Sequence, residues 1–530
     1  MKILDLATAG RLSGLPGAVL SGRDRELLAP LELAVEDELP ACSRARARDG
    51  ALARALADTN AAYGHPRAEE LSRAFADPAT VVVVGGQQPG LFGGPLYTLS
   101  KAAAVVLAAE RISAAGKPAV PLFWVASEDH DFTESSRAVF LSPRGPFAVD
   151  LGNDPAPLTP VGMRPLGPAV VAALETLKER IPGDRAAAWI DTLAGWYRPE
   201  SRFGEAFSRL LVYLMGERAP LLVDSMLPEL KAAQRPWLER LVGRRQEVAA
   251  ALAARETAIE RAGHELQVKP QAEAAPLFWI RDGERRRIEW AEGGYRLRGL
   301  AEVEPLERLT GTLEENPEAI SPGVQARPLI QDAVLGSALA VLGPGELAYM
   351  PQVAPLYELL EVPPPRLLLR PQALFVEARH LDWREEMELE WGELTGSSFD
   401  VESWLAARAD GDPVPSLGAE VDRLLAGLER PLAGLDPNLR GPLEKTRQHV
   451  ERGLATLSGK VRGALARQDE VLLGRLRQLR ELCFPDAAPQ ERVLSTAHFP
   501  AKHGRAVAEA LLDQLGLAPG SLNLVVLEDG

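Results

Sequence analysis

The spacing of apolar residues changes several times along this chain of 530 residues, and each change predicts a different kind of element. Residues 1–78 carry apolar side chains about one helical turn apart, for example Leu27 and Leu31, then Leu52 and Leu56. This spacing is typical of amphipathic helices. It predicts an N-terminal helical segment that packs on the core formed by the residues after it.

Short apolar runs then predict strands that are buried on both faces, as in a parallel sheet. These runs are 81–84, 120–126, 220–224 and 338–342. Between the first two, residues 95–115 have helical spacing and begin with a proline, which fits the first turn of a helix. A strand, a glycine loop, a helix and a second strand form a βαβ unit. The pattern therefore predicts an α/β fold, with a parallel sheet covered by helices on both faces.

Long stretches between these strands are predicted to be insertions. Residues 145–200 are rich in proline at first and then helical, and residues 226–335 begin with a helical stretch at 229–263. Later in the second insertion, residues 278–290 contain the dipeptide Asp282-Gly283, which favours the tight turn of a β-hairpin. The sheet is therefore expected to carry two added substructures, and the second should include a hairpin.

From Pro363 onward the chain is predicted to be helical and strongly charged, until a short α/β tail with a strand at 522–527. Apolar residues recur there at intervals typical of a coiled-coil seam, at Leu439, Leu443, Val450, Leu454, Leu457, Val461, Leu465, Leu472, Leu476 and Leu479. The partner helix could come from 373–392, from 417–430 or from a second subunit. The alternative is a long helix that covers the core.

Charge and composition narrow the function classes. The chain carries 59 Lys and Arg against 74 Asp and Glu, a formal net charge of −15, which argues against non-specific nucleic-acid binding. Cys42 and Cys483 are isolated, so neither a disulfide framework nor a cysteine-based metal cluster is expected. The N-terminus lacks an apolar signal region, and the longest apolar run, 118–126, is about half as long as a membrane span. A soluble, reduced, cytoplasmic protein without membrane contact is predicted.

Open parallel sheets bind ligands at the carboxyl ends of their strands, so candidate chemistry is expected there. After the first strand, five glycines fall within ten residues, with Gln87 and Gln88 among them. Gly86 and Gly90 let the backbone turn tightly and approach a ligand, and each glutamine can donate and accept hydrogen bonds. The segment matches neither a dinucleotide-binding motif nor a P-loop. An ordinary glycine-rich turn is the alternative to a ligand-binding loop.

Lys101 lies about two turns into the helix that follows this loop, with Tyr97 one turn before it on the same face. The chain contains 50 arginines and only nine lysines. A lysine retained in such a chain suggests a need for a compact ammonium rather than a guanidinium fork. A solvated surface lysine is the alternative.

A cluster of ionisable residues follows the second strand, which itself contains Trp124. The cluster consists of Ser127, Glu128, Asp129, His130 and Asp131. Its three carboxylates are expected to hold His130 in one tautomer and to raise its pKa, so that it acts as a general base toward an amine. A divalent metal ranks below this role because no second histidine lies nearby. A loop that only caps the next helix is the other alternative.

Polar residues gather in a third region, on either side of the fourth predicted strand. They are Arg327, Gln331, Asp332, Glu346 and Tyr349. A guanidinium can fork onto a carboxylate or a phosphate, and the other four supply polar contacts. Taken singly, each favours a surface or capping role. Together they supply the groups that a polar, carboxylate-bearing substrate requires.

At these residues the sequence resembles the family of the bacillithiol biosynthesis cysteine-adding enzyme, a cysteine ligase family. The resemblance rests on long motifs that occur in the family's order over nearly the whole chain. These are GQQPGLFGGPLYTLSK at 86–101, FWVASEDHDF at 123–132, RPLIQD at 327–332, GPGELAY at 343–349 and the shorter PQER at 489–492.

The resemblance implies a Rossmann-like core interrupted by two connecting insertions, together with an α-helical coiled-coil domain that supports a homodimer. Applied to this chain, it predicts four parts. They are an N-terminal helical segment at 1–78, a catalytic core at 79–380, a coiled-coil domain at 381–484 and an α/β tail at 485–530.

The resemblance also implies a ligase that forms an amide bond, the last step of bacillithiol biosynthesis. It would join L-cysteine through its carboxyl group to the glucosamine amine of glucosaminyl-malate. His130 and the carboxylates beside it would handle the amine, and the glycine loop with Gln87 and Gln88 would hold the acyl group or its anionic activator. Arg327 or Lys101 would meet malate or phosphate charge, so the pocket of this acidic protein is expected to be locally basic.

Activation of cysteine is required because an amide does not form efficiently from a free carboxylate in water. ATP or another activating nucleotide is therefore expected, although no motif shows it, and a metal requirement is not indicated by any motif. Two other functions stay open. One is a nucleotide- or metabolite-binding scaffold that recruits partners through its helical arm, and the other is a transferase that uses an already activated cysteine.

Overall fold

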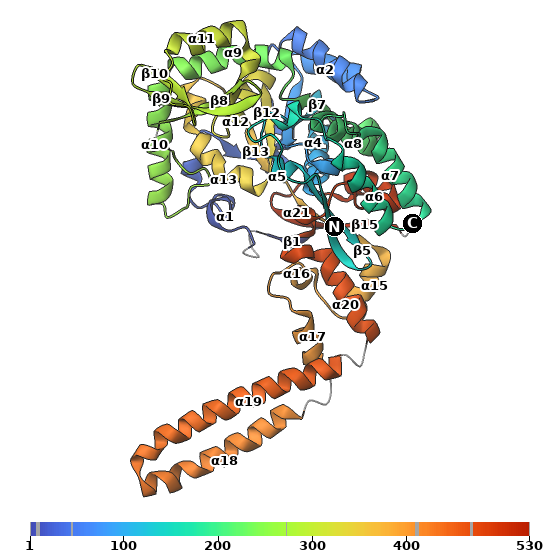
Figure 1. Cartoon of the computed structure of the whole chain (residues 1–530), viewed down its shortest axis with the longest axis vertical. Helices are drawn as coiled ribbons and strands as arrows, with labels where there is room; N and C mark the ends of the chain where they lie inside the picture. The colour runs from blue at the N-terminus through green and yellow to red at the C-terminus, as the bar shows by residue number, and fades with distance from the viewer. Residues whose placement is uncertain are drawn as a thin grey trace. The chain divides into compact units, whose positions relative to one another are not determined.

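Residues 2–6, 11–43, 46–271, 273–408, 413–466 and 470–528 are described by the structure, a computed structural model. They divide into two units (Figure 1). The first unit comprises residues 1–378 and 490–530, and the second comprises residues 379–489. The segments at the two ends of the chain therefore both belong to the first unit.

Six parallel strands form the main sheet of the first unit within the described residues, in the order β2-β13-β12-β3-β4-β7. Their bounds are Glu32–Leu33 for β2, Arg366–Leu369 for β13, Ser337–Leu342 for β12, Val81–Gln87 for β3, Ala119–Val125 for β4 and Leu221–Asp224 for β7. The four strands predicted from apolar runs are β3, β4, β7 and β12, so these predictions and the α/β class are confirmed.

Two predictions of helix are wrong at the edge of this sheet. The first concerns the segment around Leu31, which contains the short strand β2 rather than a continuous helix. The second concerns the chain after Pro363, where β13 and β14 (Gln372–Glu377) precede any helix. A run of leucines suits a helix as well as a strand, but Leu367, Leu368 and Leu369 are all buried, as in a strand covered on both faces.

Helices surround the main sheet (Figure 1). The helix predicted at 95–115 is α4 (Tyr97–Ala114), which packs on β3 and β4. The other helices that flank the sheet or the N-terminal segment are α1 (Gly14–Leu20), α2 (Gly50–Ala62), α3 (Ala68–Ala76), α8 (Phe203–Met215), α12 (Arg327–Leu335), α13 (Pro344–Val353) and α14 (Pro355–Leu359). Leu52 and Leu56 lie on the buried face of α2, as their spacing predicts.

The first insertion combines a β-hairpin with two helices. The hairpin consists of β5 (Arg137–Ser142) and β6 (Gly145–Asp150), and it follows the short helix α5 (Phe132–Ser135). The helices are α6 (Ala169–Arg180) and α7 (Asp184–Trp196), which pack on each other.

The second insertion carries its own antiparallel sheet, ordered β10-β9-β8-β11. Its strands are β8 (Ala274–Arg281), β9 (Glu284–Ala291), β10 (Gly294–Leu297) and β11 (Ile320–Pro322), accompanied by α9 (Pro228–Gly243), α10 (Arg245–Arg261) and α11 (Leu306–Glu315). The predicted hairpin is confirmed as β8 and β9, and both Asp282 and Gly283 have positive φ, as a tight hairpin turn requires. The predicted helix at 229–263 is two helices, α9 and α10.

A three-stranded sheet joins distant parts of the chain in the first unit. It has the order β1-β15-β14, with β1 at Lys2–Asp5 and β15 at Ser521–Leu527. The strand predicted at 522–527 is thus confirmed as β15. The last helices of the chain are α21 (Gln490–Val493), α22 (Pro500–His503) and α23 (Ala506–Gln514).

The second unit is helical. Its helices are α15 (Ala378–Glu386), α16 (Trp391–Leu394), α17 (Val401–Arg408), α18 (Val414–Leu435), α19 (Arg440–Ala466) and α20 (Glu470–Cys483). α18 and α19 pack on each other, so the candidate partner at 417–430 is confirmed for the part of the seam in α19. Of the candidate at 373–392, residues 373–377 belong to β14, whereas Glu386 of α15 pairs with Arg475 of α20 at 2.9 Å, beside the last part of the seam. The predicted seam begins at Leu439, just before α19, and continues through α19 into α20, and residues 467–469 between these two helices lie outside the described residues.

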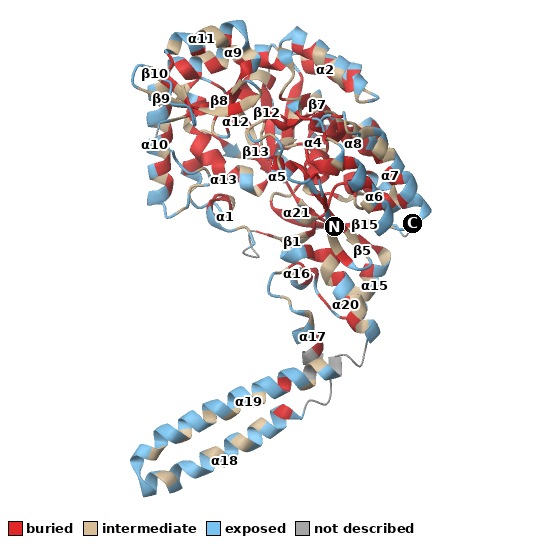
Figure 2. Cartoon of the chain, viewed as in Figure 1, coloured by how far each residue is buried: buried red, intermediate tan, exposed pale blue. Residues whose placement is uncertain are grey.

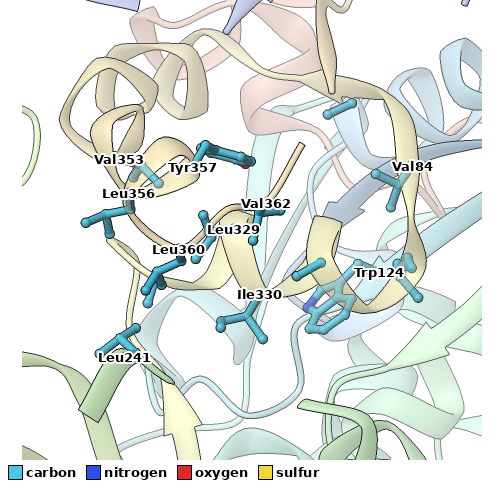
Figure 3. Packing of buried hydrophobic residues seen from close by; sticks show 14 of the residues in the cluster. Val84, Trp124, Leu241, Leu329, Ile330, Val353, Leu356, Tyr357, Leu360 and Val362 are labelled. Carbon is cyan, nitrogen blue, oxygen red and sulfur yellow. The ribbon is translucent and has the colours of Figure 1, made fainter. Parts of the chain in front are cut away.

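Burial separates the two units clearly (Figure 2). In the first unit the strands of the main sheet are buried almost throughout, whereas α18 and α19 are mostly exposed. Trp124 of β4 and Ile330 of α12 belong to one large hydrophobic cluster of the first unit, part of which is drawn in Figure 3. This cluster fixes the sheet and α12 beside it, and it thereby positions the loops at the carboxyl ends of the strands.

Candidate active site

A cavity of about 510 Å³ lies at the carboxyl ends of β3, β4 and β12. Predicted site residues that line it are Gly86, Gln87, Gln88, Tyr97, Lys101, Trp124, Arg327, Glu346 and Tyr349. These residues come from three sequence regions, which converge because parallel strands end at the same edge of a sheet. Predicted residues that do not line it are Gly90, Ser127, Glu128, Asp129, His130, Asp131, Gln331 and Asp332.

The glycine loop after β3 is shaped by close packing. A Cβ on Gly85 would lie 2.6 Å from Val105 of α4, and a Cβ on Gly86 would lie 2.7 Å from Trp124 of β4. Glycine therefore lets β3 approach both neighbours at the edge where the cavity opens. Gln87 donates from Nε2 to the hydroxyl of Tyr97 at 3.4 Å.

Lys101 is the most enclosed cation of the cavity, with only 3% of its surface exposed. Its Nζ donates to the carbonyl of Gly86 at 2.7 Å, to Oε1 of Gln87 at 3.2 Å and to a carboxylate oxygen of Glu346. Burial lowers the pKa of Lys101, and the attraction of Glu346 opposes this only in part. An ammonium has three donors, and all three are used here. The surface-lysine alternative is therefore wrong, and Lys101 organises the loop instead of offering a free charge.

Glu346 sits in the first turn of α13, where it also accepts a hydrogen bond from the backbone N–H of Gly343 at 2.8 Å. This places its carboxylate at the helix N-terminus, which favours a negative charge. A guanidinium nitrogen of Arg327 lies 3.8 Å away. Burial alone would raise the pKa of Glu346, but the charges of Lys101 and Arg327 hold it below its usual value.

Arg327 begins α12 and is held from two sides. It donates to Oε1 of Gln331 at 2.9 Å and to the hydroxyl of Tyr349 at 2.8 Å. Although burial opposes the charged form, Tyr349 and Glu346 raise the pKa of Arg327, which stays cationic. Asp332 joins this group through Gln331, whose Nε2 donates to Oδ1 of Asp332 at 3.4 Å, and its negative charge also helps to raise the pKa of Arg327. Its other oxygen, Oδ2, accepts from the hydroxyl of Tyr357 at 2.6 Å.

The sequence argument missed three charged residues of the cavity, Glu134, Arg370 and Arg492, and also missed the uncharged Gln267, Val268 and Val324. Arg370 follows β13 and forms a bidentate pair with Glu491 at 2.9 and 2.8 Å, with both side chains buried. Its Nε is buried without a hydrogen-bond partner among the described residues. Only Arg492 carried a signal, as the last residue of the segment at 489–492.

Glu134 comes from the short helix α5, next to the cluster after β4. Burial and the charges of Asp131 and Asp129 raise the pKa of Glu134. A carboxylate with a raised pKa is better matched to proton transfer near neutral pH. Of the two carboxylates that line the cavity among the described residues, Glu134 is the exposed one and the one whose pKa is raised, whereas that of Glu346 is lowered.

The cluster after β4 divides into separate environments. Glu128 turns into the interior and pairs with Lys231 of α9 at 2.5 Å, while the hydroxyl of Ser127 donates to Asp224 of β7. Asp131 accepts from the N–H of Glu134 at 3.0 Å and so caps α5, as the capping alternative proposed. These contacts fix the carboxyl ends of β4 and β7 to each other.

His130 is 30% exposed and lies beside Arg285, which comes from β9 of the second insertion. Nη1 of Arg285 lies 3.2 Å from Nδ1 of His130, and Oδ1 of Asp129 lies 3.6 Å from the same ring nitrogen. The prediction that neighbouring carboxylates raise the pKa of His130 is wrong. Burial and Arg285 lower it, and the opposing charges of Asp129 and Asp131 are weaker.

The described residues contain no group of three or more His, Cys, Asp or Glu side chains arranged to hold a metal ion. No helix among them combines the length and apolarity needed to cross a bilayer. Both cysteines are buried, and burial raises the pKa of each thiol.

Models of two known protein domains match this chain, and together they cover most of both units. The N-terminal Rossmann-like domain of the bacillithiol biosynthesis family BshC matches residues 34–371, and the C-terminal coiled-coil domain of the same family matches residues 373–523. The chain belongs to the BshC family. This confirms the Rossmann-like core and the coiled-coil domain that the motifs implied.

Curated members of the BshC family match over most of the chain. A protein of Thermus thermophilus is 32% identical over 83% of this chain and 87% of its own length. A protein of Solibacter usitatus is 30% identical over 86% of both chains, and one of Heliobacterium modesticaldum is 29% identical over 96% of both. Each is named "Putative cysteine ligase BshC". A ligase role in bacillithiol biosynthesis is the function associated with these relatives.

Proposed function

We propose that this protein joins the carboxyl group of L-cysteine to the glucosamine amine of glucosaminyl-malate, which forms bacillithiol. The observation that carries the proposal is the charge of the cavity. Among the described residues, four cationic side chains and two carboxylates line it, in a chain whose net charge is −15. The cationic residues are Lys101, Arg327, Arg370 and Arg492. A locally basic cavity in an acidic protein suits a substrate that carries two carboxylates.

Different contacts support different tasks for these four cations. Lys101 is saturated by the protein, so malate is bound by the arginines instead. Arg327 is presented by Gln331 and Tyr349 as a fixed fork, and Arg492 has no ion-pair partner among the described residues. Planar guanidinium groups bind carboxylates in a bidentate manner, so two arginines match the two carboxylates of malate.

The acyl group of cysteine, or the anionic group that activates it, lies against the glycine loop with Gln87 and Gln88. ATP or a related nucleotide supplies the activation, because a free carboxylate does not acylate an amine in water. The attacking amine must lose a proton, and Glu134 accepts it at the cavity wall. His130, Asp129 and Asp131 lie in the loop that precedes Glu134. Glu128 stabilises this loop through its buried pair with Lys231.

The active form is a homodimer joined through the helical arm, which consists of the second unit, residues 379–489. Leu424 and Leu428 of α18 are 65% and 46% exposed, although they lie on a helix that already pairs with α19 within the chain. Leucines that stay exposed on a paired helix are suited to bury against a second copy.

The reaction is tested by incubating purified protein with L-cysteine and glucosaminyl-malate, with and without ATP, and measuring bacillithiol by mass spectrometry. ATP-dependent bacillithiol formation is expected. Product without added nucleotide, formed only from a pre-activated cysteine, would favour a transferase. No product under any condition, with other proteins retained by residues 379–489, would favour a scaffold.

A variant pair sharpens this test. Arg327→Met should weaken the use of glucosaminyl-malate, because it removes a fork from the cavity. Arg111→Met is the matched control, since Arg111 is an exposed arginine paired with Glu36 outside the cavity. Equal activity of both variants would contradict the placement of the malate group.

A further inference from the structure

Arg285 is a buried guanidinium that is held on several sides. Its Nε donates to the hydroxyl of Ser321 at 2.9 Å, and its Nη2 donates to the carbonyl of Pro322 at 3.1 Å. The centre of the guanidinium lies 3.8 Å from the centroid of the Phe278 ring. These contacts use two directions of the fork and leave Nη1 directed at Nδ1 of His130, 3.2 Å away. The arginine is therefore fixed in place before any substrate binds.

This contact determines where the proton of His130 lies. A guanidinium N–H can only donate, so Nδ1 of His130 must accept and cannot carry a hydrogen. The neutral ring then carries its hydrogen on Nε2. A doubly protonated ring would place an N–H against the N–H of Arg285, with two positive charges in contact.

The other charged groups around His130 do not reverse this preference. Asp129 approaches both His130 and Arg285 at 3.6 Å, so its charge is shared between the two. Asp131 acts in the same direction as Asp129, while Arg164 acts in the direction of Arg285. Asp154 also interacts electrostatically with His130, and its carboxylate is paired with Arg164 at 2.5 Å. The balance of these groups and of burial favours the neutral ring.

We propose that Arg285 is a positioning residue that keeps His130 neutral, with its hydrogen on Nε2, so that His130 serves as a hydrogen-bond donor rather than as a base. This inference rests on the proposed cysteine ligation. Nε2 of His130 has no hydrogen-bond partner among the described residues, and the side chain is 30% exposed at the end of β4. His130 itself does not line the cavity, but Gln88 does, and Nε2 of Gln88 donates to the backbone carbonyl of Asp131, the residue after His130, at 3.2 Å. At this border of the cavity, a donor on Nε2 of His130 stabilises the oxyanion that develops on a cysteine carbonyl held by the glycine loop when the amine attacks.

With His130 as donor and Glu134 as proton acceptor, every bond change of the amide-forming step can be written. The amine nitrogen of the sugar forms a bond to the activated carbonyl carbon of cysteine, and the carbonyl electrons move to the oxygen, which accepts a hydrogen bond from Nε2 of His130. The amine proton passes to the carboxylate of Glu134. The carbonyl then re-forms, and the phosphate or nucleotide that activated cysteine leaves with the electron pair of its bond to carbon.

The second insertion gains a defined role from this arrangement. Arg285 belongs to the β8–β9 hairpin, whereas His130 follows β4 of the main sheet, 155 positions earlier. The hairpin therefore sets the protonation state of a residue at the end of a core strand.

The tautomer is tested directly by NMR on protein labelled with ¹⁵N-histidine. His130→Gln identifies the signals of His130 among those of the seven histidines. In the wild-type protein, Nδ1 should show the chemical shift of an unprotonated acceptor and Nε2 that of a protonated nitrogen. Detection of hydrogen on Nδ1 would overturn the proposal, whether or not the protein makes bacillithiol.

Variants of Arg285 test how the titration of His130 depends on this contact. Arg285→Met should move the titration of His130, followed by its ¹⁵N shifts, to higher pH, with KM for cysteine little changed. Arg285→Lys should restore much of the wild-type behaviour, because a cation returns to the site. Arg287→Met is the matched control, since Arg287 lies on the same strand, 5.2 Å from the same Phe278 ring, and does not contact His130.

The outcomes separate this inference from the proposed function. An unchanged titration of His130 in Arg285→Met refutes the role of Arg285 even if coupling activity is normal. If Arg285→Met does not fold, the wild-type tautomer and the Arg285→Lys titration decide the question. A correct tautomer in a protein without coupling activity would refute the ligase proposal and leave the Arg285–His130 pairing supported.

Discussion

Replacing Lys101 by methionine probes the electrostatic centre of the cavity. In Lys101→Met, Glu346, whose side chain is 21% exposed, keeps only the N–H of Gly343 at 2.8 Å and the more distant Arg327 at 3.8 Å. The pKa of Glu346 should rise above its usual value, because burial raises it and the main opposing charge is gone. Protonating a carboxyl of ordinary pKa about 4.3 at a pH of about 7 costs about 3.7 kcal/mol, which is the upper limit of the electrostatic loss.

The pH dependence of this loss has a definite sign. In the variant the folded state binds a proton that the unfolded state releases, so stability falls as the pH rises above the unfolded pKa. The loss relative to wild type should shrink by up to about 1.4 kcal/mol for each pH unit between about pH 7 and about pH 5. In the wild-type protein the sign is opposite, since the lowered pKa of Glu346 adds stability that disappears as the pH falls through it.

Urea unfolding followed by tryptophan fluorescence measures the effect at several pH values. The control is the double variant Lys101→Met with Glu346→Gln, which leaves no unpaired charge and should show a loss that does not change with pH. A Lys101→Met protein as stable as wild type at neutral pH would refute the reasoning. A loss of equal size at every pH would refute it as well, because it would trace to packing alone.

Three further perturbations follow from the structure. Arg327→Met should raise KM for glucosaminyl-malate by about tenfold to a hundredfold in steady-state kinetics, the value of a charged hydrogen bond, and an unchanged KM would remove Arg327 from the binding site. Gly93→Ala should lower stability by about 2–4 kcal/mol in thermal unfolding, against about 1 kcal/mol for Gly116→Ala, and equal losses would contradict the packing argument. Both glycines have positive φ, but only at Gly93 would a Cβ lie 2.8 Å from a neighbouring side chain. Leu424→Lys with Leu428→Lys should convert the proposed homodimer to a monomer in analytical ultracentrifugation without changing the unfolding of the first unit, and a persistent dimer would place the interface elsewhere.

The sequence was sufficient to predict the strands at the centre of the main sheet but not the two strands β2 and β13 at its edge. β3 and β4 are runs of β-branched and aromatic residues with neighbours on both faces, so composition alone identifies them. β2 has only two residues, too few to show the alternation of apolar and polar positions that predicts a strand. β13 is a leucine run, which helices and buried strands share, and only its partners in the sheet decide between them.

The same division applies to the candidate site. Gln87, Lys101 and Glu346 were predicted because they follow strands that end at one edge, and the structure brings them into contact. Arg285 was missed because a single arginine in a hairpin is indistinguishable, among 50 arginines, from a surface residue. For this reason the pKa of His130 was predicted in the wrong direction, since the carboxylates beside it are visible in the sequence and the guanidinium is not.

The first unit is built from two segments of the chain, and the second segment is synthesised only after the helical second unit. β15, which lies between β1 and β14, and Glu491, which pairs with Arg370 at the cavity, both leave the ribosome after the entire helical arm. The two junctions of the arm meet where Gln490 exchanges hydrogen bonds with the backbone of Phe375 at 2.8 and 2.9 Å. A nascent chain that stops anywhere within the arm therefore lacks both the middle strand of a sheet and a buried partner of the site. Catalytic competence should therefore appear only after residues 490–527 have been synthesised, so that chains interrupted within the arm remain inactive.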